Sequence, residues 1–354
     1  MMMRIYRTWP LLARIALLLC MFAPGLAPAA EDQPAQAQAQ RQVTQPLNNA
    51  PFWREVRKGE NNPYQTTQVR GPETQVLIQS EGEMWRQFRN GPITIYGGWF
   101  IVVVFLAILL FYWRRGKLRM REPRTGRLIE RFSTWERIVH WTVAITFIIL
   151  AVTGIIMLFG KHVVLPVLGY TLFSWLAMLG KNLHNFLGPL FAVSLIVMAV
   201  TYLHDNVPKA YDWIYVRRFG DFLRGETVPA GRFNAMEKFW FWAGVILLGI
   251  IVSATGLVMD FPNFDQTRGA MQIANMIHAI AAVLFIALSL GHIYIGTIGM
   301  EGAYDAMRHG YVDETWAREH HVYWYEEVMR GERRGAGGSP TTAPAASVKE
   351  GWKL

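Results

Sequence analysis

Four of the nine histidines fall within or at the ends of long apolar stretches: His140, His184, His278 and His292. An ionisable side chain in a membrane is costly and usually marks a functional site. His278 and His292 are 14 residues apart in one stretch, so on a helix they share a face and lie about 21 Å apart along its axis. His140 begins one stretch at its expected cytoplasmic end, called the inner side here. His184 begins the next stretch at the opposite, outer side of the membrane. Depth therefore predicts an inner pair, His140 with His292, and an outer pair, His184 with His278.

Two imidazoles at one depth suit the axial positions of a six-coordinate haem b, which leaves no open site for oxygen. The pattern predicts two haem b groups with these four histidines as iron ligands, forming an electron path across a layer that excludes ions. A zinc site would need three or four ligands at one depth, whereas two converge at each level. The alternative for any single histidine is a hydrogen bond to a neighbouring helix.

Gly154 follows His140 by 14 residues, which predicts that it lies on the same face at the depth of the outer pair. A glycine there leaves room for a porphyrin, or for close packing of two helices. The strings TGIIM (153–157) and TGLVM (255–259) resemble each other and hint at an old duplication.

The composition is that of a membrane protein, since 52% of the 354 residues are hydrophobic and 17% are charged. Soluble domains carry about 25% charged residues. The single cysteine, Cys20, excludes an internal disulfide, a self-held iron–sulfur cluster and a CxxCH haem attachment. Five stretches are long enough to span a bilayer, at about 94–113, 139–159, 183–203, 240–258 and 277–298. Residues 162–179, interrupted by Pro166 and Gly169, are expected to form a re-entrant or interfacial loop.

The two ends of the chain have distinct compositions. Residues 1–30 have a basic start, a short apolar core and small residues before Glu31, which is typical of a cleaved signal peptide. The polar segment 31–92 is predicted to be periplasmic, and residues 332–354 to form a disordered cytoplasmic tail.

Basic residues concentrate in the loops after the first and third spans. The positive-inside rule makes these loops cytoplasmic, which predicts a periplasmic N-terminus and a cytoplasmic C-terminus in a bacterial inner membrane. The net charge of +9 is assigned to these loops, and no nucleic-acid partner is expected.

Two other groups of histidines lie at the cytoplasmic side. His204 follows His184 by 20 residues and faces the other side of that helix, so it is not expected to pair with it. His320 and His321 belong to the aromatic and acidic segment 316–327. This segment is expected either to contact a partner subunit or to lie at the interface as a snorkelling helix.

Six strings carry a resemblance to a known family: ERIVHW from Glu136, LHNFLG from Leu183, FNAMEK from Phe233, IHA from Ile277, GHIY from Gly291 and EHHVYWY from Glu319. From about Arg131 to Val328, the chain resembles the cytochrome b (gamma) subunit of membrane-bound respiratory formate dehydrogenase. This di-haem b family is shared with the cytochrome b of nickel–iron hydrogenases.

The resemblance implies that a molybdenum or tungsten catalytic (alpha) subunit oxidises formate and that an iron–sulfur (beta) subunit docks on this chain. Electrons would enter the outer haem, cross to the inner haem and reduce a membrane quinone near the inner face. The family's quinone pocket matches Asn234, Ala235 and His292. Asn234 also reads as a helix N-cap, with Glu237 at the capping-box position. Arg137 is a candidate partner of a haem propionate, and its alternative is a snorkelling interface arginine.

The expected fold is an all-α membrane protein: a four-helix transmembrane di-haem cytochrome b core at 114–331, one extra N-terminal transmembrane helix at 93–113 and a cleaved signal peptide. The competing functions are a nickel–iron hydrogenase cytochrome b, a haem-free membrane anchor and a small transporter that relays protons through histidines. The transporter is disfavoured because no Asp, Glu, Lys or Arg lies deep in the spans.

Overall fold

The computed structural model describes residues 80–264 and 266–331. The predicted signal peptide (1–30), most of the segment 31–92 and the predicted tail (332–354) lie outside the described residues. The chain divides into two units, Met1–Glu83 and Met84–Leu354. Of the first unit only residues 80–83, the first turn of a helix, are described; all other described elements belong to the second.

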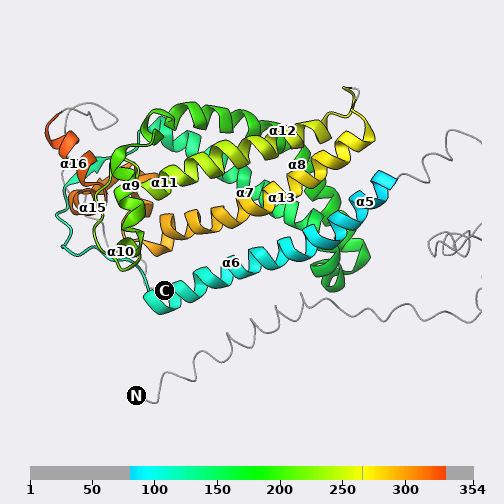
Figure 1. Cartoon of the computed structure of the whole chain (residues 1–354), viewed down its shortest axis with the longest axis horizontal. Coiled ribbons are helices and arrows are strands. Elements are labelled where there is room, and N and C mark those ends of the chain that lie inside the picture. The colour runs from blue at the N-terminus through cyan, green and yellow to red at the C-terminus, as the bar shows by residue number, and fades with distance from the viewer. Residues whose placement is uncertain (1–79, 265, 332–354) are drawn as a thin grey trace, which may run out of the picture. The chain divides into compact units, whose positions relative to one another are not determined.

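Five described helices are long and apolar enough to cross a membrane, and they run alongside one another (Figure 1). They are assembled from α5 (Ser80–Phe88), η1 (Arg89–Ile93) and α6 (Thr94–Arg115); α7 (Thr134–Val163); α8 (Leu165–Tyr202); α11 (Ala235–Phe239), η3 (Trp240–Leu248) and α12 (Gly249–Asp260); and α13 (Arg268–Tyr294) with η4 (Ile295–Gly299). The elements η1, η3 and η4 are π-helical turns within these helices. The predicted all-α membrane architecture, with one helix before a four-helix core, is confirmed.

The predicted loop at residues 162–179 is wrong, because most of this segment is helical. α7 continues to Val163, and α8 begins at Leu165. Gly169 interrupts α8 with φ 71° and ψ 174°, a conformation that favours glycine. From residue 170 to Tyr202 the helix is continuous, so it extends well beyond the predicted span, which begins at 183.

Small side chains allow the helices to approach closely. A Cβ atom on Gly249 of α12 would lie 2.6 Å from Leu195 Cδ2 of α8, so these backbones meet at a glycine. A Cβ on Gly97 of α6 would lie 3.2 Å from Val283 Cγ2 of α13, which brings the extra helix against the four-helix core. Without a hydrophobic force between helices in lipid, such close packing is a main source of association.

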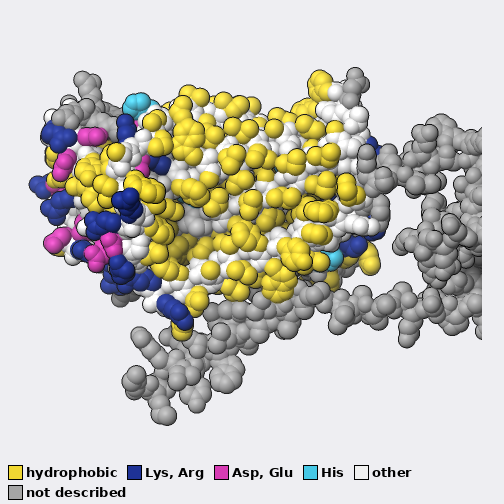
Figure 2. Space-filling view, in the orientation of Figure 1, with side chains coloured by type: hydrophobic (Ala, Val, Ile, Leu, Met, Phe, Trp, Pro, Cys, Tyr) yellow, Lys and Arg dark blue, Asp and Glu magenta, His cyan; other side chains and the backbone are white. Residues whose placement is uncertain are grey.

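Short elements form a cap at the end of the bundle where α7 begins and α8 ends: η2 (His204–Asn206), α9 (Ala210–Arg217), α10 (Phe219–Leu223), α14 (Ala303–His309), α15 (Glu314–His320) and α16 (Val322–Met329), with strands β1 (Leu128–Glu130) and β2 (Tyr311–Asp313). The strands pair antiparallel, with Ile129 opposite Val312. On the face shown in Figure 2, charged side chains gather at this end and hydrophobic side chains cover the long helices. This is the division expected of a chain with one end in water and its body in lipid.

Two arginines in the cap connect the starts of two membrane helices, because each binds a glutamate of the other helix. The capping box of α7 joins Ser133 and Glu136, and Arg232 binds Glu136 at 2.8 Å. The capping box of α11 joins Asn234 and Glu237, and its Glu237 is bound in turn by Arg131, the residue two before Ser133, at 3.0 Å. Each arginine therefore neutralises the capping carboxylate of the other helix.

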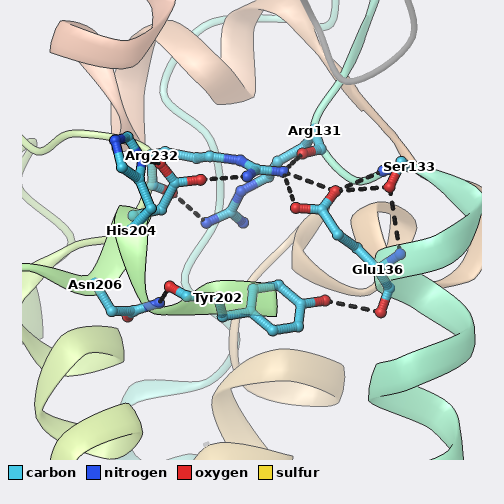
Figure 3. A network of polar contacts seen from close by, with 8 residues as sticks. Arg131, Ser133, Glu136, Tyr202, His204, Asn206 and Arg232 are labelled. Carbon is cyan, nitrogen blue, oxygen red and sulfur yellow. Dashed lines mark hydrogen bonds and ion pairs between the residues drawn. The ribbon is translucent and has the colours of Figure 1, made fainter. Parts of the chain in front are cut away.

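Backbone and side-chain contacts close this network. Arg131 Nη2 donates to the carbonyl of Arg232 at 2.9 Å, and Arg232 Nη2 donates to the carbonyl of Arg131. Arg232 also pairs with Asp205, and Tyr202 donates to the carbonyl of Glu136 at 2.8 Å. Figure 3 shows Arg232 between the carboxylates that it joins. The starts of α7 and α11 and the end of α8 are thus held together.

We predict that Arg232→Met lowers the free energy of unfolding by about 3 kcal/mol, because removing one partner of a buried ion pair leaves an uncompensated charge. Glu136 and Asp205 are only 11% and 12% exposed. Thermal unfolding of the purified chain in detergent measures the loss. Arg121→Gln is the matched control, since Arg121 and Glu226 are about half exposed and 3.8 Å apart and should contribute under about 1 kcal/mol. Equal losses in both variants would contradict a structural role of the buried network.

Candidate functional site

The outer histidine pair forms between two different helices. The ring centroids of His184 on α8 and His278 on α13 are 6.1 Å apart, with an interplanar angle of 71°. His184 Nδ1 lies 2.8 Å from Thr153 Oγ1 of α7, and His278 Nδ1 lies 3.1 Å from Thr255 Oγ1 of α12. Four helices therefore build this site: two provide imidazoles and two provide the hydroxyls that hold them.

The inner pair joins α7 and α13. The ring centroids of His140 and His292 are 6.3 Å apart, with an interplanar angle of 53°. Trp240 stacks on His292 with centroids 4.8 Å apart and an angle of 11°. Gly244, one turn after Trp240, leaves space for the indole, because a Cβ there would lie 2.7 Å from Trp240 Cε3. The tryptophan thus fixes the plane of one imidazole of the pair.

Both pairs fit two nitrogen ligands on opposite sides of one metal ion. A metal–imidazole bond is about 2 Å long, so two rings facing one metal have centroids roughly 6 Å apart. Gly154 and Gly256 lie beside the outer pair. A Cβ on Gly154 would lie 3.5 Å from His184 Cε1, and a Cβ on Gly256 would lie 3.4 Å from His278 Cε1, both ordinary van der Waals contacts. The glycine predicted at the outer level therefore faces an outer histidine.

An aromatic layer separates the two pairs. Phe147 lies seven residues from both His140 and Gly154, and Phe285 lies seven residues from both His278 and His292. The rings of these phenylalanines are 4.7 Å apart, and Phe191 of α8 lies beside them at 6.2 and 6.4 Å. These apolar rings fill the bundle midway between the inner and outer levels.

The candidate quinone residues lie at the start of the fourth membrane helix. Asn234 is the N-cap of α11: its Oδ1 accepts from the backbone N–H groups of Met236 and Glu237, so the N-cap prediction is confirmed. The cap uses only the amide oxygen, and Nδ2 takes no part in it. Ala235 is buried at the first helical position. Six residues after Asn234, the helix presents Trp240 to His292, which connects this helix start to the inner pair.

Arg137 lies one turn before His140 and faces the cap. Its Nη1 donates to the carbonyl of Arg308 at 3.2 Å, and its Nη2 donates to Thr134 Oγ1 at 3.3 Å. Its Nε is buried and has no hydrogen-bond partner among the described residues. The guanidinium therefore keeps an unused donor beside Gly310, where a Cβ would lie 3.1 Å from Nε.

The segment 316–327 packs buried aromatic side chains against loops of its own chain. Trp316, His321 and Trp324 are buried. His321 Nδ1 donates to the carbonyl of Gly231 at 2.7 Å, and the backbone N–H of Tyr323 donates to the carbonyl of Ala230. This segment thus holds the loop that leads to Asn234, a role that neither expectation for it included.

The other histidines stand apart from the pairs. His204 lies just beyond the end of α8, in η2, where its side chain is 93% exposed and contacts Asp205. Among residues 80–264 and 266–331, no group of three or more His, Cys, Asp or Glu side chains is arranged to hold a metal ion.

The sequence-based predictions did not include the capping box of Ser133 and Glu136 or the contacts of Thr153 and Thr255 with the outer histidines, although a repeat marks both. The string RFSTWE at 131–136 matches RFNAME at 232–237, and both end in a capping-box glutamate. Each is followed by the Thr–Gly pair that holds an outer histidine, 17 residues after Glu136 and 18 after Glu237. The π-helix η3 lies within the longer interval, and its wider turn absorbs the additional residue.

The fold and the paired histidines define a multi-pass membrane protein of the haem-binding type. Residues 131–310 match the prokaryotic cytochrome b561 family, and the chain belongs to this family, whose members bind haem b.

The chain is similar to three cytochrome subunits of formate dehydrogenase. It is 32% identical over 211 residues to the cytochrome b556(fdo) subunit of Escherichia coli K12, covering 57% of this chain and 94% of that protein. It is 29% identical over 220 residues to the nitrate-inducible cytochrome b556(Fdn) subunit of the same organism, covering 59% and 95%. It is 26% identical over 212 residues to the cytochrome b556 subunit of Haemophilus influenzae, covering 57% and 84%.

We predict that His320 of the cap makes the fold acid-sensitive. Burial lowers the pKa of His320 to about 4, against about 6.5 in an unfolded chain. Below pH 6.5 the unfolded state binds more protons at this site, so stability falls as the pH drops from 6.5 towards 4. His320→Leu should reduce the loss of unfolding free energy between pH 7 and pH 5 by about 2 kcal/mol.

Thermal unfolding of the chain in detergent at the two pH values measures this difference. His309→Leu is the control, because His309 is exposed and its replacement should leave the pH dependence of the wild type. An unchanged pH dependence in His320→Leu would contradict the prediction.

Proposed function

We propose that this chain is the membrane cytochrome b subunit of a formate dehydrogenase and passes electrons through two b haems to membrane quinone. The observation that carries the proposal is the pairing of four histidines at two levels, with ring centroids 6.1 and 6.3 Å apart. The names of the similar bacterial subunits support formate as the electron source.

The four histidines are the proposed axial ligands, with His184 and His278 on the outer haem and His140 and His292 on the inner haem. Each haem, when bound, supplies one-electron transfer at iron. The chain supplies neutral imidazoles in fixed orientation, and bis-histidine ligation leaves no open position for oxygen. Phe147, Phe191 and Phe285 keep ions and water out of the layer between the two levels.

The inner level is the proposed place of quinone reduction. Asn234 Nδ2 is a suitable donor to a quinone carbonyl, since the helix cap engages only Oδ1. Ala235 and His292 complete the proposed pocket, with the Trp240 ring stacked beside the imidazole. The unused Nε donor of Arg137 suits a propionate of the inner haem. A pocket at the basic end of the chain would draw protons from the cytoplasm.

The proposed partners are an iron–sulfur (beta) subunit, which docks at the outer level, and a molybdenum or tungsten catalytic (alpha) subunit beyond it. The proposed location is the bacterial inner membrane, with the N-terminus periplasmic and the C-terminus cytoplasmic. Residues 1–30 are the proposed signal peptide, 31–92 a periplasmic segment, 93–113 the extra span, 114–331 the di-haem domain and 332–354 the cytoplasmic tail. The charged cap at one end of the bundle (Figure 2) supports this orientation, because basic loops remain cytoplasmic.

We predict that His184→Ala or His278→Ala reduces the haem content from two to one per chain and stops formate-dependent quinone reduction. Formate oxidation by an artificial dye should continue, because its chemistry lies in another subunit. Haem quantification and both activity assays on membranes containing the complex measure these effects. His204→Ala is the control and should behave as the wild type. Full quinone reduction in the His278→Ala membrane would contradict the proposal, and reduction of the haems by hydrogen but not by formate would reassign the electron donor.

We predict that substitutions of Asn234 separate its two roles. Asn234→Ser keeps a good N-cap and should retain stability, whereas Asn234→Ala should lose about 1 kcal/mol. Both variants lose the amide donor, so both should slow quinone reduction at least tenfold while haem content and reduction of the haems by formate remain. Thermal unfolding and quinone-reductase assays give the two readouts. Quinone reduction at the wild-type rate in Asn234→Ser would show that Asn234 acts only as a helix cap and does not bind quinone.

A further inference from the structure

We infer that the hydroxyls of Thr153 and Thr255 make the outer haem the lower-potential one, so that electrons run downhill from the outer to the inner level. The inference rests on the proposed di-haem function. It assigns to these threonines a positioning role that acts through the imidazoles.

The hydrogen bonds of the threonines determine which nitrogen of each imidazole carries the proton. The hydroxyl of Thr153 has one hydrogen, and two backbone carbonyls can accept it, that of Ile149 at 2.9 Å and that of Leu150 at 3.1 Å. With the hydrogen donated to a carbonyl, the oxygen acts as the acceptor toward His184 Nδ1, 2.8 Å away. In this arrangement His184 carries its proton on Nδ1, which leaves the lone pair of Nε2 for iron.

The four-helix core has a first half, α7 and α8, and a second half, α11 to α13. The second half repeats this arrangement. Thr255 donates to the carbonyl of Ile251 at 2.5 Å and accepts from His278 Nδ1 at 3.1 Å. The glycine after each threonine lies beside the imidazole that the threonine holds. The repeated Thr–Gly string is therefore a device that orients one outer ligand from each half.

Among the described residues, the inner histidines have no such acceptor. His140 Nδ1 is buried and has no hydrogen-bond partner within the described part of the chain. His292 is held by the stacked ring of Trp240, which fixes its plane but accepts no hydrogen bond from Nδ1. The two levels thus differ in the hydrogen bonding of their axial ligands.

This difference changes the electron affinity of the two sites. An imidazole that donates from Nδ1 becomes a more basic metal ligand, which stabilises ferric iron and lowers the reduction potential. The arginines of the cap lie at the inner end, and Arg89 donates to the carbonyl of Met157 at the outer end. The greater positive charge at the inner end raises the inner potential, which acts in the same direction as the hydrogen bonds that lower the outer one.

A redox titration of the haem absorbance, on membranes that contain the full complex, tests the inference. The component that disappears in His184→Ala identifies the outer haem and tests the proposed function separately. Thr153→Val and Thr255→Val should each shift the outer component to higher potential, and the double variant should shift it further. The inner component should not move, because neither threonine touches its ligands.

Three variants act as controls. Thr146→Val removes a buried hydroxyl of α7 that donates to the carbonyl of Thr142 at 2.7 Å and touches no histidine, so both potentials should stay unchanged. Thr153→Ser and Thr255→Ser keep the acceptor and should restore the wild-type outer potential.

An unshifted outer component in both valine variants, or an equal shift of both components, would overturn the inference even if two haems are present. If a valine variant binds a single haem, the serine variant at that position decides. Two haems at wild-type potentials in the serine variant support the role of the hydroxyl, and loss of a haem there contradicts it.

Discussion

The depth and separation of the histidine rings constrain the rest of this structure. The proposed di-haem function requires that two imidazoles face each other roughly 6 Å apart, twice, at levels separated by four helical turns. That requirement explains why α13 carries both His278 and His292 on one face, why glycines lie beside the outer rings and why phenylalanines fill the space between the levels. Inserting or deleting one residue before a histidine in any of these helices would rotate its ring by about 100° around the helix axis and separate a pair.

The two halves of the bundle meet the constraint differently at its two ends. At the outer level, equivalent threonines from each half hold one histidine each. In the cap, equivalent arginines cross over to the capping glutamate of the other half. The inner pair departs from this symmetry, because His140 comes from the first helix of one half and His292 from the second helix of the other. The proposed quinone site at the inner level benefits from such asymmetry, since one side can be open while the other supports the ligand.

Much of this organisation could be predicted from the sequence because it depends on helical periodicity. The spacing of 14 residues between His278 and His292 gives their shared face directly, and the apolar stretches give the membrane helices. The helix at 170–182 was missed because proline and glycine signals outweighed apolar periodicity, whereas in the fold the single Gly169 confines the break to one turn. The buried segment 316–327 was missed because burial of charged loops depends on long-range pairs such as β1 with β2, which periodicity does not report. The RFxxxE repeat was readable, but its significance depends on the crossed arginine contacts that only the fold reveals.

The most direct test of the account is a dithionite-reduced minus oxidised absorption spectrum of the purified full chain, with haem quantified per protein. The account predicts a b-type spectrum and two haems per chain. One haem per chain would show that one of the histidine pairs does not hold iron. A folded chain without haem, prepared under haem-replete conditions, would contradict the electron-transfer role altogether.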